Sequence, residues 1–310
     1  MMAGFAFAAL PLAQAKIERV VEKSFTVSEV GTVTIQTSGG EIRVEPSADV
    51  STVRVVATQR FSTNSEAEAD KISNDLELVI EQSGNDVMAR ASREKRNEWT
   101  WRSLFNGNGG QQVRVDFKVI VPAAFAVVAK TSGGDLIVGD INGDVKVATS
   151  GGDVRLGRLG GTVEAKTSGG DIELRESAGK ARLETSGGDI EAGRVGGSGH
   201  FSTSGGDIEI GRVEGVLRAH TSGGDVRAGF IGGLTGDSEL STSGGDVAAT
   251  LDKSAAFELD ARTSGGRVSD KGFAISEKER RKNRLAGAVN GGGPQLKLQS
   301  SGGDISVEAR

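Results

Sequence analysis

One short motif, Thr-Ser-Gly-Gly, recurs through this sequence and restricts the folds open to it. The motif begins at Thr131 and returns every 18 residues as far as Thr221, then after steps of 21 residues at Thr242 and Thr263. Weaker copies stand nearer the two ends of the chain, at Thr37–Glu41 and Ser300–Asp304. A fixed short period is typical of a solenoid, in which each unit buries its apolar face only against its neighbours.

The residues inside one repeat follow a strand pattern. Counting the Thr as position one, positions six and eight are apolar, as in Ile172 and Leu174, and a second alternating run such as Val163 and Ala165 precedes the next Thr. A spacing of two places both side chains on one face of a strand. Glycines stand between these runs, where we expect positive φ at tight corners. Each repeat therefore predicts two short strands and a brief third segment.

These patterns predict an all-β fold, a single-chain parallel β-solenoid (β-helix) of rungs of about 18 residues with an N-terminal hairpin insertion. We expect a right-handed coil, with rungs about 4.8 Å apart. Aromatic residues make up only 4% of the chain and hydrophobic residues 36%. A narrow continuous core, filled by a few apolar side chains from each rung, accounts for folding with so few large residues.

The sequence divides into four parts. Residues 1–15 are apolar and end in Ala13-Gln14-Ala15, which is typical of a signal peptide, although the start has no positive charge; a buried apolar N-terminus is the alternative. Residues 16–61 predict N-terminal strands and a first rung, residues 62–121 a helix, a hairpin and a flap loop, and residues 122–310 the repeats with a closing rung. No apolar run is long enough for a transmembrane anchor.

Two irregular segments allow more local predictions. Asn64-Ser65-Glu66 is expected to begin a helix that ends near Asn74, and a hairpin is expected to turn at residues 83–86. The charge run Glu277–Arg284 is typical of a solvated helix or loop. Contact with an anionic lipid or polysaccharide is the alternative for that run.

The combined features resemble a bacterial family of putative adhesins, a domain of unknown function. The shared features are the export signal, the early strands and hairpin, a strand ending in Val121-Pro122, the repeated Thr-Ser-Gly-Gly-Asp rungs and the closing element Asn290–Pro294. The resemblance covers roughly Phe25 to Val307. It implies a cell-envelope or surface location and an adhesion role, and it supplies no catalytic residues.

Composition excludes several classes of function. The net charge of −5, with 25% charged residues, does not favour binding to nucleic acid. The chain has no Cys, which excludes disulfides, thiolate metal sites, Cys nucleophiles and lipoprotein acylation.

One Asp follows the glycine pair in almost every repeat. It is expected to accept backbone N–H groups at a turn, and a row of calcium sites is the alternative. Calcium solenoids place Asp differently, as Gly-Gly-x-Gly-x-Asp, so no metal or cofactor is expected. The series is broken at Arg267, resumes at Asp304, and otherwise comprises Asp135, Asp153, Asp171, Asp189, Asp207, Asp225 and Asp246.

Equivalent carboxylates favour a scaffold over a catalyst, because acid–base pairs need environments that push their pKa values apart. The two histidines, His200 and His220, occupy different positions in their repeats. We therefore expect a non-enzymatic envelope or surface module, with a polysaccharide-acting β-helix enzyme as a minor alternative. An end-to-end polymerising solenoid, which would self-associate, is the main alternative. Opposite charges at neighbouring repeats, Arg155 with Glu173 and Glu209 with Arg227, are expected to pair.

The only local concentration of aromatic and basic residues lies within residues 93–105. A flap packed on the solenoid is one interpretation. The other is contact with an unknown envelope or surface component, a protein or a polysaccharide, because Trp and Arg are enriched among residues that dominate binding. The residues singled out for this contact are Arg96, Trp99, Trp101 and Arg102.

Overall fold

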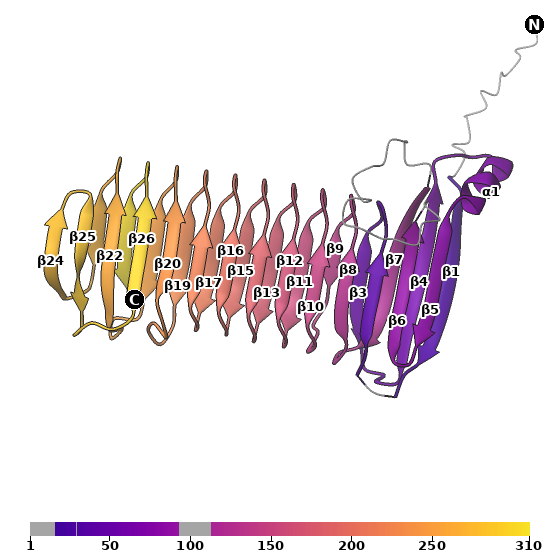
Figure 1. Cartoon of the computed structure of the whole chain (residues 1–310), viewed down its shortest axis with the longest axis horizontal. Coiled ribbons are helices and arrows are strands. Elements are labelled where there is room, and N and C mark those ends of the chain that lie inside the picture. Colours follow the sequence, from indigo (N-terminus) through magenta and orange to yellow (C-terminus); the bar gives the residue numbers. More distant parts are fainter. Residues whose placement is uncertain (1–15, 29, 93–112) are drawn as a thin grey trace, which may run out of the picture.

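The computed structural model describes residues 16–28, 30–92 and 113–310, and over these it forms one elongated stack of strands (Figure 1). The single described helix is α1 (Glu66–Asn74). Two sheets face each other along the whole length and enclose one continuous core. The predicted all-β solenoid is therefore confirmed.

The first sheet, called sheet A, contains 13 described strands. In spatial order they are β1 (Glu18–Thr26), β4 (Thr52–Phe61), β7 (Val113–Pro122), β3 (Ile42–Ser47), β9 (Leu136–Val138), β11 (Val154–Leu159), β13 (Ile172–Ser177), β15 (Ile190–Val195), β17 (Ile208–Val213), β19 (Val226–Phe230), β21 (Val247–Leu251), β27 (Ile305–Ala309) and β23 (Val268–Lys271).

The second sheet, called sheet B, contains 14 described strands. From the opposite end they are β24 (Ile275–Arg281), β25 (Arg284–Val289), β22 (Phe257–Thr263), β26 (Gln295–Ser300), β20 (Ser238–Thr242), β18 (Leu217–His220), β16 (Gly199–Ser202), β14 (Ala181–Glu184), β12 (Val163–Lys166), β10 (Val145–Ala148), β8 (Ala126–Lys130), β2 (Thr32–Gln36), β6 (Asp86–Ser92) and β5 (Glu77–Ser83).

One repeat supplies one strand to each sheet. The sheet B strand runs into the Thr-Ser-Gly-Gly turn, and the turn leads into the sheet A strand, as in β12, Thr167 to Gly170 and β13. Positions six and eight are buried in all six regular repeats, because their side chains point between the sheets. The brief third segment continues the sheet A strand in some repeats: Leu159, Val195 and Val213 are the last residues of β11, β15 and β17. In the first repeat it stays separate, since Ile141 lies beyond the end of β9 and makes an isolated bridge with Leu159. The rung is thus flattened into two layers.

The turn glycines correct the expected role of glycine. Within the described chain, positive φ among glycines is confined to Gly84, Gly232, Gly233, Gly272, Gly291 and Gly292. Of the corner glycines between the two runs of the regular repeats, only those at Gly232 and Gly233 therefore have the expected conformation, and no glycine of a Thr-Ser-Gly-Gly turn has it. A Cβ on Gly170 would instead lie 2.1 Å from the Gly152 carbonyl oxygen of the preceding rung. Close approach of stacked backbones, and not the dihedral angle, requires glycine there.

The spatial order of the rungs differs from their order in the sequence. The early rung, β2 and β3, pairs directly with β8 and β9. The strands between them in the sequence lie at the N-terminal end of the stack, where β6 and β7 pair in parallel with β2 and β3, and β5 and β4 pair antiparallel with β6 and β7. Strand β1, from the start of the described chain, then pairs antiparallel with β4. The helix and hairpin predicted in this insertion are present as α1 and as β5 with β6.

The C-terminal end contains two further corrections. Strands β26 and β27 were expected to form the closing rung, but they pair between the rungs of Thr242 and Thr263. The rung of Thr263 is therefore the outermost one. The charge run Glu277–Arg284 was expected as a helix or loop, yet it forms the hairpin of β24 and β25, which extends sheet B. Alternating Leu285, Gly287 and Val289 face the core and favour a strand there.

Candidate functional site

The edge formed by the turns carries a continuous ladder of threonine hydroxyls. Thr167 Oγ1 donates a hydrogen bond to the Gly152 carbonyl oxygen at 2.9 Å and accepts one from the Gly170 N–H at 3.3 Å. The same bond to the preceding rung is made by Thr131, Thr149, Thr185, Thr203, Thr221, Thr242, Ser300 and Thr263. The motif signalled these residues, but sequence reasoning gave them no role. Their hydroxyls satisfy buried carbonyls between rungs.

The Asp side chains form a second ladder beside the first. The Oδ1 atom of each Asp accepts a hydrogen bond from the backbone N–H of the corresponding residue in the next rung, at distances from 2.7 to 3.0 Å. A bond within the same turn was expected; the donor belongs to the neighbouring rung instead. These bonds supply an attraction that opposes repulsion between stacked carboxylates about 5 Å apart.

Arg267 ends the Asp ladder. The Arg267 N–H donates to Asp304 Oδ1 at 2.9 Å, and Asp304 in turn donates its N–H to Asp246. Sequence order suggested that Arg267 interrupts the series. In space it occupies the outermost rung, since β23 is the last strand of sheet A. A residue in that place has no further backbone N–H to bind, so a carboxylate is not needed.

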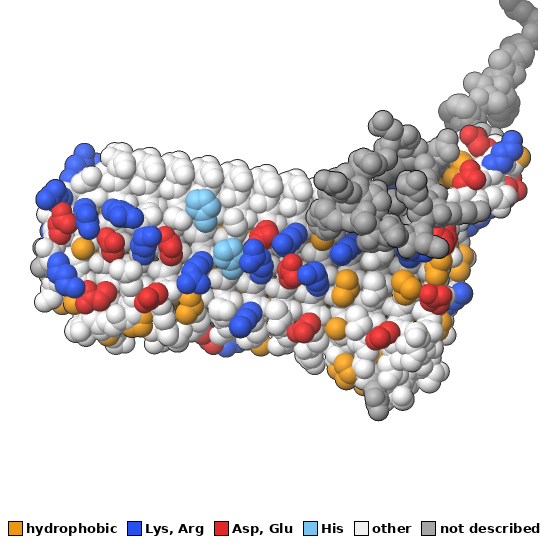
Figure 2. Space-filling view, in the orientation of Figure 1, with side chains coloured by type: hydrophobic (Ala, Val, Ile, Leu, Met, Phe, Trp, Pro, Cys, Tyr) orange, Lys and Arg blue, Asp and Glu red, His pale blue; other side chains and the backbone are white. Residues whose placement is uncertain are grey.

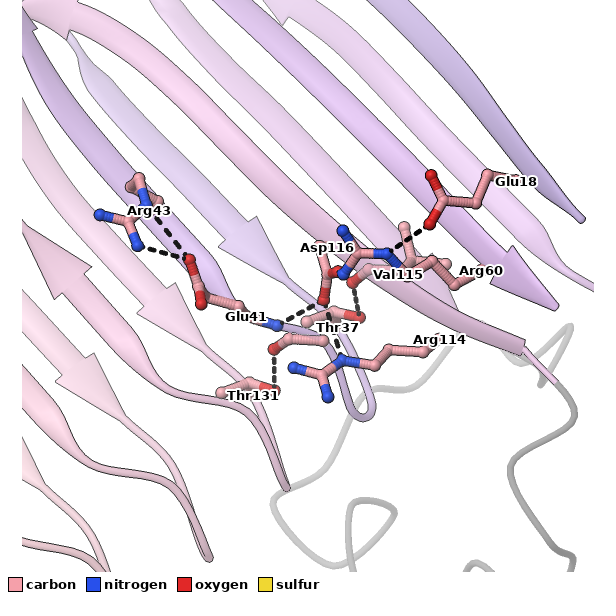
Figure 3. Close-up of polar contacts among 10 residues, drawn as sticks. Glu18, Thr37, Glu41, Arg43, Arg60, Arg114, Val115, Asp116 and Thr131 are labelled. Carbon is pink, nitrogen blue, oxygen red and sulfur yellow. Dashed lines mark hydrogen bonds and ion pairs between the residues drawn. The ribbon is translucent and has the colours of Figure 1, made fainter. Parts of the chain in front are cut away.

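The opposite end of the ladder is a polar cluster at the junction with the insertion (Figure 3). Asp116 Oδ1 accepts from the Glu41 N–H at 2.8 Å and from Arg114 Nε at 3.0 Å, while its Oδ2 pairs with Arg60. Glu18 also contacts Arg60, at 2.9 Å, and these two carboxylates raise the pKa of Arg60 above its ordinary value, the Glu18 hydrogen bond being the larger cause. Asp116 thus makes the same bond to the next rung as the ladder Asp residues do, whereas Glu41, at the Asp position of that next rung, binds Arg43 with its carboxylate.

The outermost parallel rung has no Thr-Ser-Gly-Gly motif between its two strands. Ser92 ends β6 in sheet B and Val113 begins β7 in sheet A, and residues 93–112, which connect them in the sequence, lie outside the described residues. The partner-contact residues Arg96, Trp99, Trp101 and Arg102 lie outside the described residues. Their role stays a prediction.

Charged side chains cover the outward face of sheet B (Figure 2). Lys146 pairs with Glu164 of the next rung at 2.7 Å, and Lys146 is the main cause of a lowered Glu164 pKa. The expected pairs on sheet A do not form. Arg155 and Glu173 are neighbours in register, but the guanidinium binds Asp153 at 2.9 Å. The Asp ladder lies closer along the same strand and competes for the cation.

Arg227 also pairs with an Asp of its own repeat and not with the Glu of the neighbouring strand. It is in register with Glu209, yet its guanidinium pairs with Asp225 of its own strand. The second predicted ion pair is therefore also wrong, for the same reason.

The two histidines lie on neighbouring strands of sheet B without stacking on each other. His200 is in register with Arg182 and Arg218, whereas His220 is in register with Ser202 and Ser241. Burial, followed by the positive charge of Arg182, lowers the pKa of His200. His220 Nδ1 contacts Ser241 Oγ at 3.0 Å. Neither histidine therefore has a carboxylate as its neighbour in register.

The described residues contain neither a cluster of metal ligands nor a membrane-spanning helix. No three His, Asp or Glu side chains are grouped there as ligands of a metal ion would be. The described helix, at nine residues, falls far short of the roughly 20 apolar residues that cross a bilayer.

Comparison with known proteins identifies a family and a shared fold. The Toastrack DUF4097 family model matches residues 49–308. No curated protein sequence matches the chain. Among solved structures, a putative lipid binding protein from Parabacteroides distasonis is similar with a TM-score of 0.50 and 15% identity, over 93% of this chain and 96% of that one.

A second similar structure is a putative adhesin from Parabacteroides merdae, with a TM-score of 0.37 and 11% identity, over 94% of this chain and 97% of that one. A putative adhesin from Bacteroides fragilis has a TM-score of 0.29 and 15% identity, over 93% and 97% of the two chains. At such identities these likenesses concern the fold alone.

Proposed function

The chain belongs to the Toastrack DUF4097 family, and we propose that it acts as an exported, non-enzymatic scaffold or adhesion module of the cell envelope. One observation carries the proposal: the acidic groups of the turn edge are equivalent and bound in the same way. From Asp135 to Asp225, every ladder carboxylate accepts the N–H of the next rung. A catalytic pair requires one acid and one base in contrasting surroundings.

A long, regular surface suits binding to an extended partner. The rungs present the same turn edge and two broad faces repeatedly, so contacts with a polymer or a surface can add along the stack. The coil is held by backbone bonds, buried hydroxyls and the Asp ladder, which leaves the other outward side chains free to vary without loss of the fold. These properties are those of a scaffold.

The compartment follows from the predicted signal peptide, residues 1–15. Fractionation of cells that express a tagged full chain separates cytoplasm, periplasm, membranes and surface in one experiment. Recovery in periplasmic, envelope or extracellular fractions, with removal of the leader shown by mass spectrometry, supports the proposal. Recovery in the cytoplasm with the leader intact contradicts it.

We further propose that the contact with the partner, a protein or polysaccharide of the envelope, includes Arg96, Trp99, Trp101 and Arg102. Their segment connects a strand of sheet B to a strand of sheet A without the Thr-Ser-Gly-Gly motif, so its sequence departs from the regular chemistry of the repeats. Specific binding needs such a local difference, and buried Trp and Arg contribute most when they are present.

The double variant Trp99→Ala/Trp101→Ala tests this contact. Attachment to purified envelope material is expected to fall, while the melting temperature stays that of the unmodified protein. Trp99→Phe/Trp101→Phe serves as the matched control, because it retains aromatic area, and Arg155→Ala as a control on a regular rung. Unchanged attachment of the alanine variant removes the segment from the contact, and an unfolded variant assigns the two tryptophans to the core.

A further inference from the structure

The two ends of the stack carry opposite charge. The N-terminal end consists of β1 and of residues 65–83 in α1 and β5, and together these hold eight Asp and Glu against three Lys and Arg. The C-terminal end consists of residues 262–284, which hold eight Lys and Arg against three Asp and Glu. Figure 2 shows the basic side chains gathered over the C-terminal end.

Both ends also present strands with one unpaired edge. In sheet B, β5 pairs only with β6, and β24 pairs only with β25. Each of these two strands has seven residues. An unpaired edge is a template for pairing with another chain, unless it is blocked.

The polarity of the strands permits head-to-tail stacking. Strand β5 runs against the parallel rungs, because it is antiparallel to β6 and β6 is parallel to β2. Strand β24 runs with the rungs, because it is antiparallel to β25 and β25 is antiparallel to β22. When one copy follows another along the same axis, β5 and β24 meet as an antiparallel pair.

The signs of the charges show whether they prevent the ends of two copies from pairing or favour it. Charges of the same sign at both ends would repel every end-to-end approach. Here like ends repel and unlike ends attract. The arrangement disfavours symmetric head-to-head or tail-to-tail pairs and favours a heterologous contact, which repeats into a linear assembly when it does not close.

We propose that the protein associates head to tail with further copies of itself, the acidic end of one copy meeting the basic end of the next. The inference rests on the charge and topology of the ends and does not depend on the proposed adhesion role. The N-terminal edge is partly occupied, since Lys23 Nζ donates to the Ile80 carbonyl oxygen of β5 at 2.8 Å. Complementary charge therefore has to supply much of the attraction, which makes the association sensitive to salt.

Sedimentation velocity of the purified full chain tests the proposal over a range of protein concentrations. At about 20 mM NaCl, where charges act over about 20 Å, we expect species that grow with concentration. At about 1 M NaCl, where screening reduces that range to about 3 Å, we expect monomers. Monomers at every concentration in low salt overturn the proposal, as does association that is unaffected by salt.

Charge reversal identifies the surfaces. Glu81 on β5 and Lys282 at the tip of the β24–β25 hairpin are both exposed, so Glu81→Lys and Lys282→Glu should leave the fold intact, which circular dichroism checks. Each single variant is expected to self-associate about tenfold more weakly. Arg155→Glu, in the middle of the stack, is the control and is expected to associate as the unmodified protein does.

Mixing the two single variants separates a head-to-tail contact from any other. In the mixture, the reversed β5 end of the Glu81→Lys variant can meet the reversed hairpin tip of the Lys282→Glu variant, and the remaining two ends are unmodified. Association is therefore expected to be stronger in the mixture than in either variant alone. Failure of the mixture to recover, or equal association of both single variants and the control, refutes the head-to-tail contact.

Discussion

The two glycines of one turn, Gly169 and Gly170, are expected to respond very differently to the same substitution. A Cβ added to Gly170 would lie 2.1 Å from the carbonyl oxygen and 2.5 Å from the carbonyl carbon of Gly152. A Cβ added to Gly169 would meet nothing closer than 3.7 Å. Gly170→Ala should therefore force neighbouring rungs apart, whereas Gly169→Ala should be tolerated.

The expected loss of stability in Gly170→Ala follows from the contacts and hydrogen bonds that the backbone shift impairs. An ordinary carbon–oxygen contact of about 3.2 Å requires the backbone to move by about 1 Å, because rigid neighbours cannot yield like a flexible side chain. Such a shift weakens the Thr167 hydrogen bond to Gly152 and the Asp171 N–H bond to Asp153. Overpacking and two impaired bonds together cost about 4 kcal/mol. For a chain of this size that lowers the melting temperature by about 5–10 °C.

Thermal unfolding followed by circular dichroism measures both variants under the same conditions. Gly169→Ala is expected within about 1 °C of the unmodified protein, or slightly above it, because alanine restricts the unfolded chain. If both variants melt at the temperature of the unmodified protein, the rungs do not approach as closely as the structure has them. Equal destabilisation by both would point to backbone conformation as the reason for the glycine pair.

Further expectations concern the ladders and the histidine. Thr167→Val should lower the free energy of unfolding by about 1–3 kcal/mol, because it leaves the Gly152 carbonyl without its hydrogen bond. Thr167→Ser should lower it less, and Thr162→Val, at an exposed position in the same rung, should change it little. Any other ranking by calorimetry would show that the hydroxyl ladder does not stabilise the fold. Asp171→Ala should lower the melting temperature more than Asp171→Asn does, because asparagine keeps an acceptor for the Asp189 N–H. The melting temperature of the unmodified protein should be the same with calcium and with a chelator. A rise of many degrees with calcium would instead support cation binding at the Asp ladder. The pKa of His200 is lowered in the folded state from an ordinary value of 6.5. The folded protein is therefore most stable, as far as this histidine is concerned, above pH 6.5, and it loses stability as the pH falls toward the lower, folded-state pKa. The His200→Gln variant should lose less stability than the unmodified protein between pH 7 and pH 5, and identical pH profiles would contradict this.

Much of the local structure was predictable because a repeat displays its own pattern several times over. Apolar residues at Ile172 and Leu174 and their equivalents established which strand face is buried. The helix that begins at Glu66 and the hairpin around Gly84 were also indicated by capping and turn residues. Interactions between rungs were harder to predict. In the sequence both Asp153 and Glu173 are candidate partners of Arg155, and only the side-chain positions show that it pairs with Asp153.

The repeated motif settles the kind of fold, the burial of its strands and the turn at which each rung passes between the sheets, because these depend on residues close together in the chain. The order of the rungs could come only from the tertiary structure. Every Thr-Ser-Gly-Gly turn offers the next one the same hydroxyl, carbonyl and carboxylate, so the repeat chemistry lets one rung stack on any other. The spatial order differs from the sequence order at both ends of the stack. The rung of Ser300 pairs between those of Thr242 and Thr263, and the rung of Thr37 pairs with that of Thr131 across more than 80 intervening residues. For the same reason, the opposite charges of β5 and β24 were visible in the sequence, but only the folded chain places them at opposite ends of one axis.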